Sequence, residues 1–148
     1  MTPASNNGAG RDDAMLKQLL AVKERRRDRA HRQLIDVRKR CRHARARYDQ
    51  QEGELIAMRH HHAARIQQLR QTISSQPATG ASHVALQSQE ALFRKEEGRK
   101  EGEVNAAASH LHDAERATAA ANDAYLQEVR AVEKVKELRR LARDGKAV

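Results

Sequence analysis

The feature that most constrains this chain is the absence of proline from two long segments, roughly residues 13–73 and 84–143. Proline breaks helices, so a proline-free run of this length allows one helix to continue throughout. The intervening residues 74–83 hold Pro77, Gly80 and three serines, and they predict a turn. Two segments of nearly equal length joined by one short loop favour an antiparallel helical hairpin. We therefore predict an all-α fold, a long antiparallel two-helix coiled-coil hairpin.

The ends of the chain differ in composition from these two segments. Residues 1–11 contain Pro3, two asparagines and two glycines, and they predict a flexible N-terminal tail. Near the other end, Asp144-Gly145 predicts a helix stop at which Gly145 adopts the left-handed conformation. The predicted organisation is a helical hairpin over residues 12–145, followed by a short C-terminal tail at residues 146–148.

The composition argues against most compact folds. Charged residues make up 33% of the chain and aromatic residues only 2%, whereas alanine, the best helix former, occurs 26 times. So few large apolar side chains cannot fill the core of a globular domain of this length. The sequence also contains no glycine-rich phosphate loop and no nucleophile elbow. We expect a protein that is not an enzyme and has no cofactor.

A 3–4 spacing of mostly apolar residues predicts the face on which each helix packs, which we call the seam. Four isoleucines, Ile35, Ile56, Ile66 and Ile73, are expected to widen the seam of the first helix. In the second helix the spacing slips by a residue or two, so we expect imperfect supercoiling there. The predicted seam residues are Leu16, Leu20, Lys23, Arg27, Ala30, Leu34, Val37, Cys41, Ala44, Tyr48, Gln51, Leu55, Met58, His62, Arg65 and Leu69, and then Leu111, Ala114, Thr118, Ala121, Tyr125, Val129, Val132, Val135 and Leu138.

A hairpin that turns near residue 78 brings residue i close to residue 157 − i. Tyr48 then faces Ala106–Ala108, and Tyr125 faces the neighbourhood of Ala30 and Leu34, which places large side chains opposite small ones.

The same pairing has two further consequences. Gly53 is expected near Gly102 and Val104, where missing side chains permit a close approach of the helices. The seam is thin in large side chains, so we expect marginal stability for the isolated chain and a partner that completes it.

Positive charge is concentrated on the first segment. Residues 15–70 contain 16 Lys and Arg against 6 Asp and Glu, whereas residues 84–148 contain 12 of each. Such a face is either simply solvated or docks onto an acidic protein or nucleic acid. On a helix the arginines form two stripes, Arg38, Arg42 and Arg45 on one side and Arg25, Arg29 and Arg32 on the other.

Nucleic-acid binding is the main rival interpretation of this charge. Residues 37–47, VRKRCRHARAR, resemble a basic region in charge but lack the Asn and paired-Ala spacing of a leucine-zipper basic helix. The chain has no Cys/His finger spacing and no aromatic stacking platform. The alternative function is therefore a basic coiled-coil adaptor or a nucleic-acid-binding protein. We expect no binding to a specific nucleic-acid sequence.

The histidines and the cysteine do not predict a metal site. His60, His61 and His62 are consecutive, so on a helix they point about 100° apart and cannot converge on one ion. His62 fits better as a polar seam residue. Cys41 is the only cysteine, which fits a reducing compartment. No run of about 18 apolar residues is present, so we expect a cytoplasmic protein that is not an integral membrane protein.

Residues 19–30, LLAVKERRRDRA, resemble the opening of the central stalk family of type III secretion systems, represented by YscO in injectisomes and FliJ in flagella. That family opens with a Leu-Leu, Val-Lys, Arg-rich and Arg-Ala pattern. The detailed similarity extends over residues 16–34, and the expected hairpin architecture extends it to the whole chain.

The resemblance implies a coiled coil similar to the γ-subunit stalk of rotary ATPases. Such a stalk links a hexameric secretion ATPase to an export-gate protein at the cytoplasmic face of the apparatus, and some members also bind export chaperones. If the terminal end of the hairpin enters the ATPase ring, the residues expected to bind the ATPase are Lys23, Arg25, Arg26, Arg29, Arg32, Lys136, Arg139 and Arg140. The residues expected to bind the export gate are Leu86, Leu92 and Phe93, although Phe93 packing on Met58 or Ile66 is an equal alternative.

Overall fold

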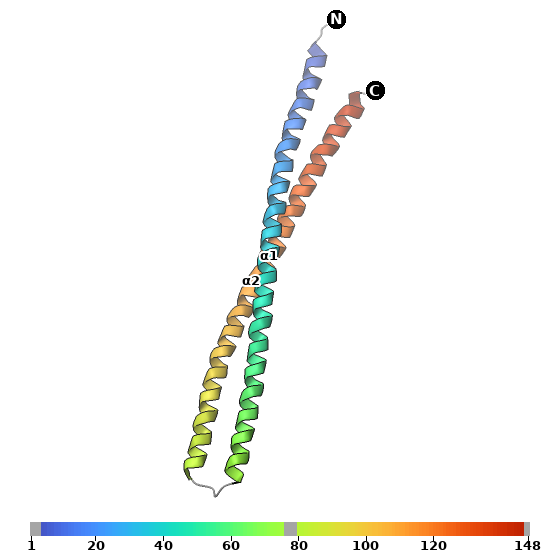
Figure 1. The fold of residues 1–148 in the computed structure, drawn as a ribbon. Helices are drawn as coiled ribbons and strands as arrows, with labels where there is room; N and C mark the ends of the chain where they lie inside the picture. The colour runs from blue at the N-terminus through green and yellow to red at the C-terminus, as the bar shows by residue number, and fades with distance from the viewer. Residues whose placement is uncertain (1–3, 76–79, 147–148) are drawn as a thin grey trace. The chain divides into compact units, whose positions relative to one another are not determined.

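The structure, a computed structural model, describes residues 4–75 and 80–146, without the side chains of residues 4–7 and 146. It consists of two long helices, α1 (Ala4–Ser74) and α2 (Gly80–Lys146), and it has no strand within these residues (Figure 1). The helices pack against each other in antiparallel orientation. The predicted all-α helical hairpin is confirmed.

Both helices extend beyond their predicted limits. α1 begins at Ala4, within the segment predicted as a tail, and α2 begins at Gly80, within the predicted loop. Adding a residue to an existing helix costs far less than starting a new one, so a long stable helix continues into weakly helical sequence. The N–H of Ser75 donates to the carbonyl of Gln71, 3.1 Å away, at the end of α1. Residues 1–3, 76–79 and 147–148, with Pro3 and Pro77, lie outside the described residues.

The predicted helix stop at Gly145 is wrong. α2 runs through Gly145 to Lys146, and no described glycine has a positive φ. The predicted close approach at Gly53 is wrong as well. A Cβ atom built at Gly53 or at Gly102 would meet nothing within 4 Å, so these glycines do not make room for the opposite helix.

Contacts between residues divide the hairpin into two compact units. The terminal unit comprises the chain up to Arg40 together with the chain from Glu115 onward, and the loop unit comprises Cys41–Ala114. In the terminal unit the rings of His31 and Tyr125 lie 5.2 Å apart, within two residues of the predicted pairing of i with 157 − i. The loop unit follows the predicted pairing to within three residues, because Arg70 pairs with Glu90 at 2.9 Å and His62 stacks on Phe93.

The seam predicted for α1 is confirmed at all but one position. Leu34 and Leu55 are buried, the other predicted residues are buried or half-buried, and only Arg65 is exposed. Ile66 is half-buried in its place, and Ile73 is also half-buried. Ile35 and Ile56 do not widen the seam, since each is 48% exposed.

The slip predicted for α2 is wrong. One series of its buried and half-buried residues keeps an unbroken alternation of three- and four-residue steps, the pattern of a regular coiled coil. The predicted seam residue Val129 is also half-buried, directly after Glu128 of this series. Leu138, predicted in the seam, is 47% exposed, and the half-buried Arg139 takes its place. Long charged side chains can fill such positions because their aliphatic stems pack while their heads reach water. The observed seam of α2 is Leu86, Glu90, Phe93, Glu97, Lys100, Val104, Ala107, Leu111, Ala114, Thr118, Ala121, Tyr125, Glu128, Val132, Val135, Arg139 and Ala142.

Candidate functional sites

The first candidate site is a group of arginines on α1 in the terminal unit. Arg25, Arg26, Arg29 and Arg32 are all exposed, and none of them forms an ion pair with a residue that the structure describes. They fall outside the seam, so the helix holds their charges in solvent. Lys23 differs from them because it occupies a half-buried seam position. The four arginines therefore carry positive charge that their own fold does not neutralise.

The three basic residues predicted on α2, unlike these arginines, each contact a carboxylate. Arg139 is half-buried and its Nε donates to Oδ1 of Asp13 across the hairpin at 3.2 Å. Arg140 binds two carboxylates of its own helix, Glu137 at 2.6 Å and Asp144 at 3.2 Å. The hydrogen bond from Arg140 lowers the pKa of Glu137. Lys136 lies 3.5 Å from Glu133.

A shallow hollow in the terminal unit brings Lys136, Arg139 and Arg140 together with Leu20 and Arg143. Most of its positive charge is matched by the carboxylates that contact these residues. Of the eight predicted ATPase-binding residues, the four arginines of α1 thus offer the most available charge.

The second candidate site is the ring of Phe93 in the loop unit. Phe93 is half-buried and stacks on the imidazole of His62, with the ring centroids 3.9 Å apart and the planes 5° from parallel. Ile66 lines a shallow hollow of the loop unit together with His62 and Phe93. Of the two interpretations of Phe93, packing within the hairpin is the one that these contacts favour. Leu86 is half-buried in the seam, and Leu92 is the exposed member of the three predicted residues.

His62 is buried in the seam, as predicted, and both of its ring nitrogens face carboxylates. Nδ1 lies 3.1 Å from Oε1 of Glu97, and Nε2 lies 3.2 Å from Oε2 of Glu96. A neutral imidazole has one N–H, so only the protonated ring donates to both carboxylates at once. Within the described residues, no group of three or more His, Cys, Asp or Glu side chains is placed to hold a metal ion.

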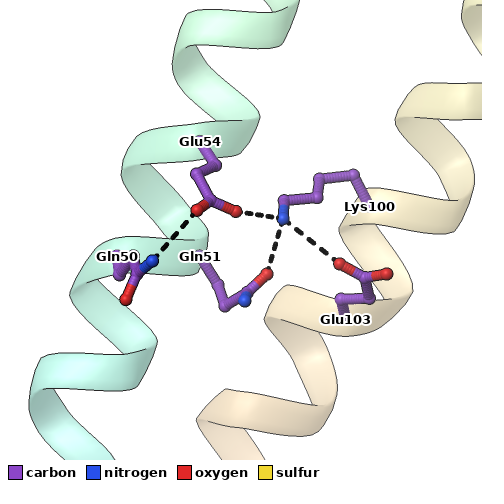
Figure 2. Close-up of polar contacts among 5 residues, drawn as sticks. All are labelled: Gln50, Gln51, Glu54, Lys100 and Glu103. Atoms are coloured by element: carbon purple, nitrogen blue, oxygen red, sulfur yellow. Dashed lines mark hydrogen bonds and ion pairs between the residues drawn. The ribbon is translucent and has the colours of Figure 1, made fainter.

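Sequence reasoning missed a polar network centred on Lys100 (Figure 2). Its ammonium group lies between Glu54 and Gln51 of α1 and Glu103 of α2, with Gln51 at 2.7 Å and Glu103 at 3.2 Å. Gln50 donates a further hydrogen bond to Glu54 at 3.2 Å. The hydrogen bond from Lys100 lowers the pKa of Glu54, and the same bond raises the pKa of Lys100. A strict seven-residue step from Phe93 through position 100 to Ala107 would have placed this lysine in the seam.

No family model matches this chain, and no curated protein and no solved structure matches it either. Among the described residues, no helix is both long and apolar enough to cross a membrane. The contacts define a structural class, an all-α antiparallel helical hairpin with a basic first helix. Any more particular role has to be argued from its surfaces.

Proposed function

We propose that this chain is the non-enzymatic central stalk of a type III secretion apparatus. In this role it links the hexameric secretion ATPase to the export-gate protein and promotes protein export. The proposal combines the hairpin fold with the resemblance of residues 19–30 to that family. The observation that carries it is the group of exposed arginines, because they lie on the segment that bears the resemblance.

The arginines suit a stalk for an electrostatic reason. Charges that have no intramolecular partner attract an oppositely charged surface over a long range and orient it during encounter. A hairpin has two different helices, so it contacts equivalent subunits of a ring unequally and can couple their nucleotide states. We therefore assign Arg25, Arg26, Arg29 and Arg32 to the ATPase contact, with Lys23, Lys136, Arg139 and Arg140 beside them. Leu92, which is exposed, remains the best candidate for the export-gate contact in the loop unit.

The test is the ATPase activity of the secretion ATPase in the presence of the purified chain. We expect the chain to stimulate hydrolysis, and the triple variant Arg25→Glu, Arg26→Glu, Arg29→Glu to need at least about tenfold more protein for the same effect. The triple variant Arg38→Glu, Lys39→Glu, Arg42→Glu is the control, because it changes net charge equally on another part of α1. Undiminished stimulation by the first variant would remove the arginine assignment, and failure of the chain to bind the ATPase would remove the stalk proposal.

The same arginines also support a second candidate function, that of a basic adaptor or nucleic-acid-binding protein. Unneutralised guanidinium groups also bind phosphates, and such binding weakens steeply with salt. We expect weak binding to a random DNA duplex that disappears at raised salt. Binding that persists at high salt and prefers one sequence would favour the nucleic-acid role over the stalk.

A further inference from the structure

The terminal unit exposes large apolar side chains on both helices. Met15, Leu19 and Val22 on α1, and Leu138 and Leu141 on α2, are between 41% and 67% exposed. We call these five residues the apolar face. Single exposed apolar residues are ordinary, but a contiguous group on one side of a molecule marks an interaction surface.

The five residues share one flank of the terminal unit. Leu19 directly precedes the seam residue Leu20, and Leu138 directly precedes the seam residue Arg139. In an antiparallel helix pair, equivalent positions of the two helices flank the seam on the same side. Positions 19 and 138 also add up to 157, so the observed register places them level with each other.

The other flank is identified independently by the basic hollow of this unit. Lys136, Arg140 and Arg143 line that hollow together with Leu20. Successive residues of a helix point about 100° apart, so Leu138 and Leu141 are directed away from that hollow.

α2 continues the apolar face as a second 3–4 repeat outside the seam. Helices of a two-helix hairpin need one apolar stripe, and a second stripe is typical of a helix that has a second neighbour. Alanine occupies half of its positions, and small side chains let another helix approach closely. All but one of its residues are exposed, Ala131 being half-buried. The repeat is Ala117, Ala120, Ala124, Gln127, Ala131, Lys134, Leu138 and Leu141.

On α1, the row of exposed residues along this flank changes from apolar to basic after Val22. Arg26 and Arg29 follow Met15, Leu19 and Val22 at the same 3–4 spacing, and neither arginine pairs with a described carboxylate. A second copy of this chain seated here would bring the basic segment of each α1 close to the other. A helix with acidic residues beside its apolar stripe complements both parts of the surface.

We propose that the apolar face binds one amphipathic, acidic helix of a partner protein, which packs as a third helix on the terminal unit. The apolar stripe of that helix lies on Leu19, Leu138 and the alanines of α2, and its carboxylates pair with Arg26 and Arg29. An amphipathic helix that lays its apolar stripe on an exposed apolar surface is a common mode of recognition. Arg26 and Arg29 also belong to the group assigned above to the ATPase contact, but the peptide test below depends only on the chemistry of this surface.

The test uses the full chain and two fluorescent synthetic helical peptides with identical leucine stripes. One peptide carries Glu beside the stripe, and the other carries Lys at the same places. We expect fluorescence anisotropy to show saturable binding of the Glu peptide and none of the Lys peptide. Equal binding of both peptides, or binding of neither, would overturn the proposal.

Two double variants locate the binding surface. Leu19→Ser with Leu138→Ser should weaken binding of the Glu peptide at least about tenfold. Ile35→Ser with Leu126→Ser should change it less than about twofold, because these similarly exposed residues directly follow seam residues and lie on the other flank. Equal losses in both variants would overturn the assignment.

A third variant keeps the test decisive if a serine variant loses helicity by circular dichroism. Arg26→Gln with Arg29→Gln leaves every apolar residue in place and should weaken the Glu peptide several-fold while reducing its salt dependence. Unchanged affinity in this variant would overturn the acidic partner. Sedimentation of the chain alone tests whether a second copy of this chain occupies the apolar face instead. If the chain is a dimer and the Leu19→Ser, Leu138→Ser variant is a monomer, the face binds a second copy and the proposal is overturned.

Discussion

The imidazole of His62 lies flat on the ring of Phe93, with the centroids 3.9 Å apart and the planes 5° from parallel. The two residues come from opposite helices, so their contact ties α1 to α2 within the loop unit. Glu96 and Glu97 hold the two nitrogens of the same imidazole, at 3.2 and 3.1 Å. Phe93, the only phenylalanine in the chain, thus provides an aromatic surface on which the buried His62 packs.

Replacing Phe93 distinguishes packing from partner binding. We expect Phe93→Ala to lower the free energy of unfolding by about 1–3 kcal/mol, less than for a fully buried ring because Phe93 is only half-buried. Urea unfolding followed by circular dichroism measures this loss. Leu92→Ala is the control, and it should change stability by less than about 0.5 kcal/mol because Leu92 is exposed. A Phe93→Ala protein as stable as the wild type would instead favour a role in binding the export gate.

The network around Lys100 predicts a loss of stability in acid. The pKa of Glu54 is lowered in the folded chain, so its ionised form stabilises the fold above the ordinary pKa of a glutamate, about 4.3. This contribution disappears as the pH falls through the lowered pKa. The Lys100→Met variant lacks the hydrogen bond that lowers the pKa, so it should lose less stability than the wild type between about pH 5 and pH 3.

The measurement is the urea midpoint at each pH for the wild type, Lys100→Met and a control, Lys95→Met. Lys95 is exposed and forms no ion pair with a described residue, so the control should follow the wild type. Parallel acid curves for all three proteins would show that the Lys100 network does not contribute to stability.

Two adjacent residues of the terminal unit test the position of the seam. Leu34 is 2% exposed, whereas Ile35 is 48% exposed. Leu34→Ala should destabilise the protein by about 2–4 kcal/mol, and Ile35→Ala by less than about 1 kcal/mol. Thermal unfolding of the two variants side by side measures the difference, and similar losses in both would mean that the helix is rotated relative to the observed seam.

Gly53 tests whether the helices approach closely at a glycine. A Cβ atom at this position would meet nothing within 4 Å, so Gly53→Ala should stabilise the protein by about 0.5–1 kcal/mol. Ala57→Gly, at another exposed position of the same helix, should cost a similar amount. Destabilisation by Gly53→Ala would restore the close approach that the sequence suggested.

Local sequence determined the helices, their pairing and most of the seam. Two proline-free segments of nearly equal length around one break favour a hairpin, and a hairpin fixes which residues meet, as His31 and Tyr125 do. The 3–4 spacing of α1 identified its buried residues because large apolar side chains such as Leu34 and Leu55 occupy that face. Spacing of this kind depends only on residues close together in the chain, so it can be read before the fold is known.

Tertiary structure alone decided which charged residues enter the seam and which apolar residues stay outside. Lys100 and Arg139 occupy seam positions because carboxylates of the opposite helix, Glu54 and Asp13, lie within reach of their charged heads. Leu138, one residue from Arg139, is left exposed by the same register. A hydrophobic pattern favours leucine over arginine at a seam position. Arg139 is favourable there because of Asp13, which lies more than a hundred residues away along the chain.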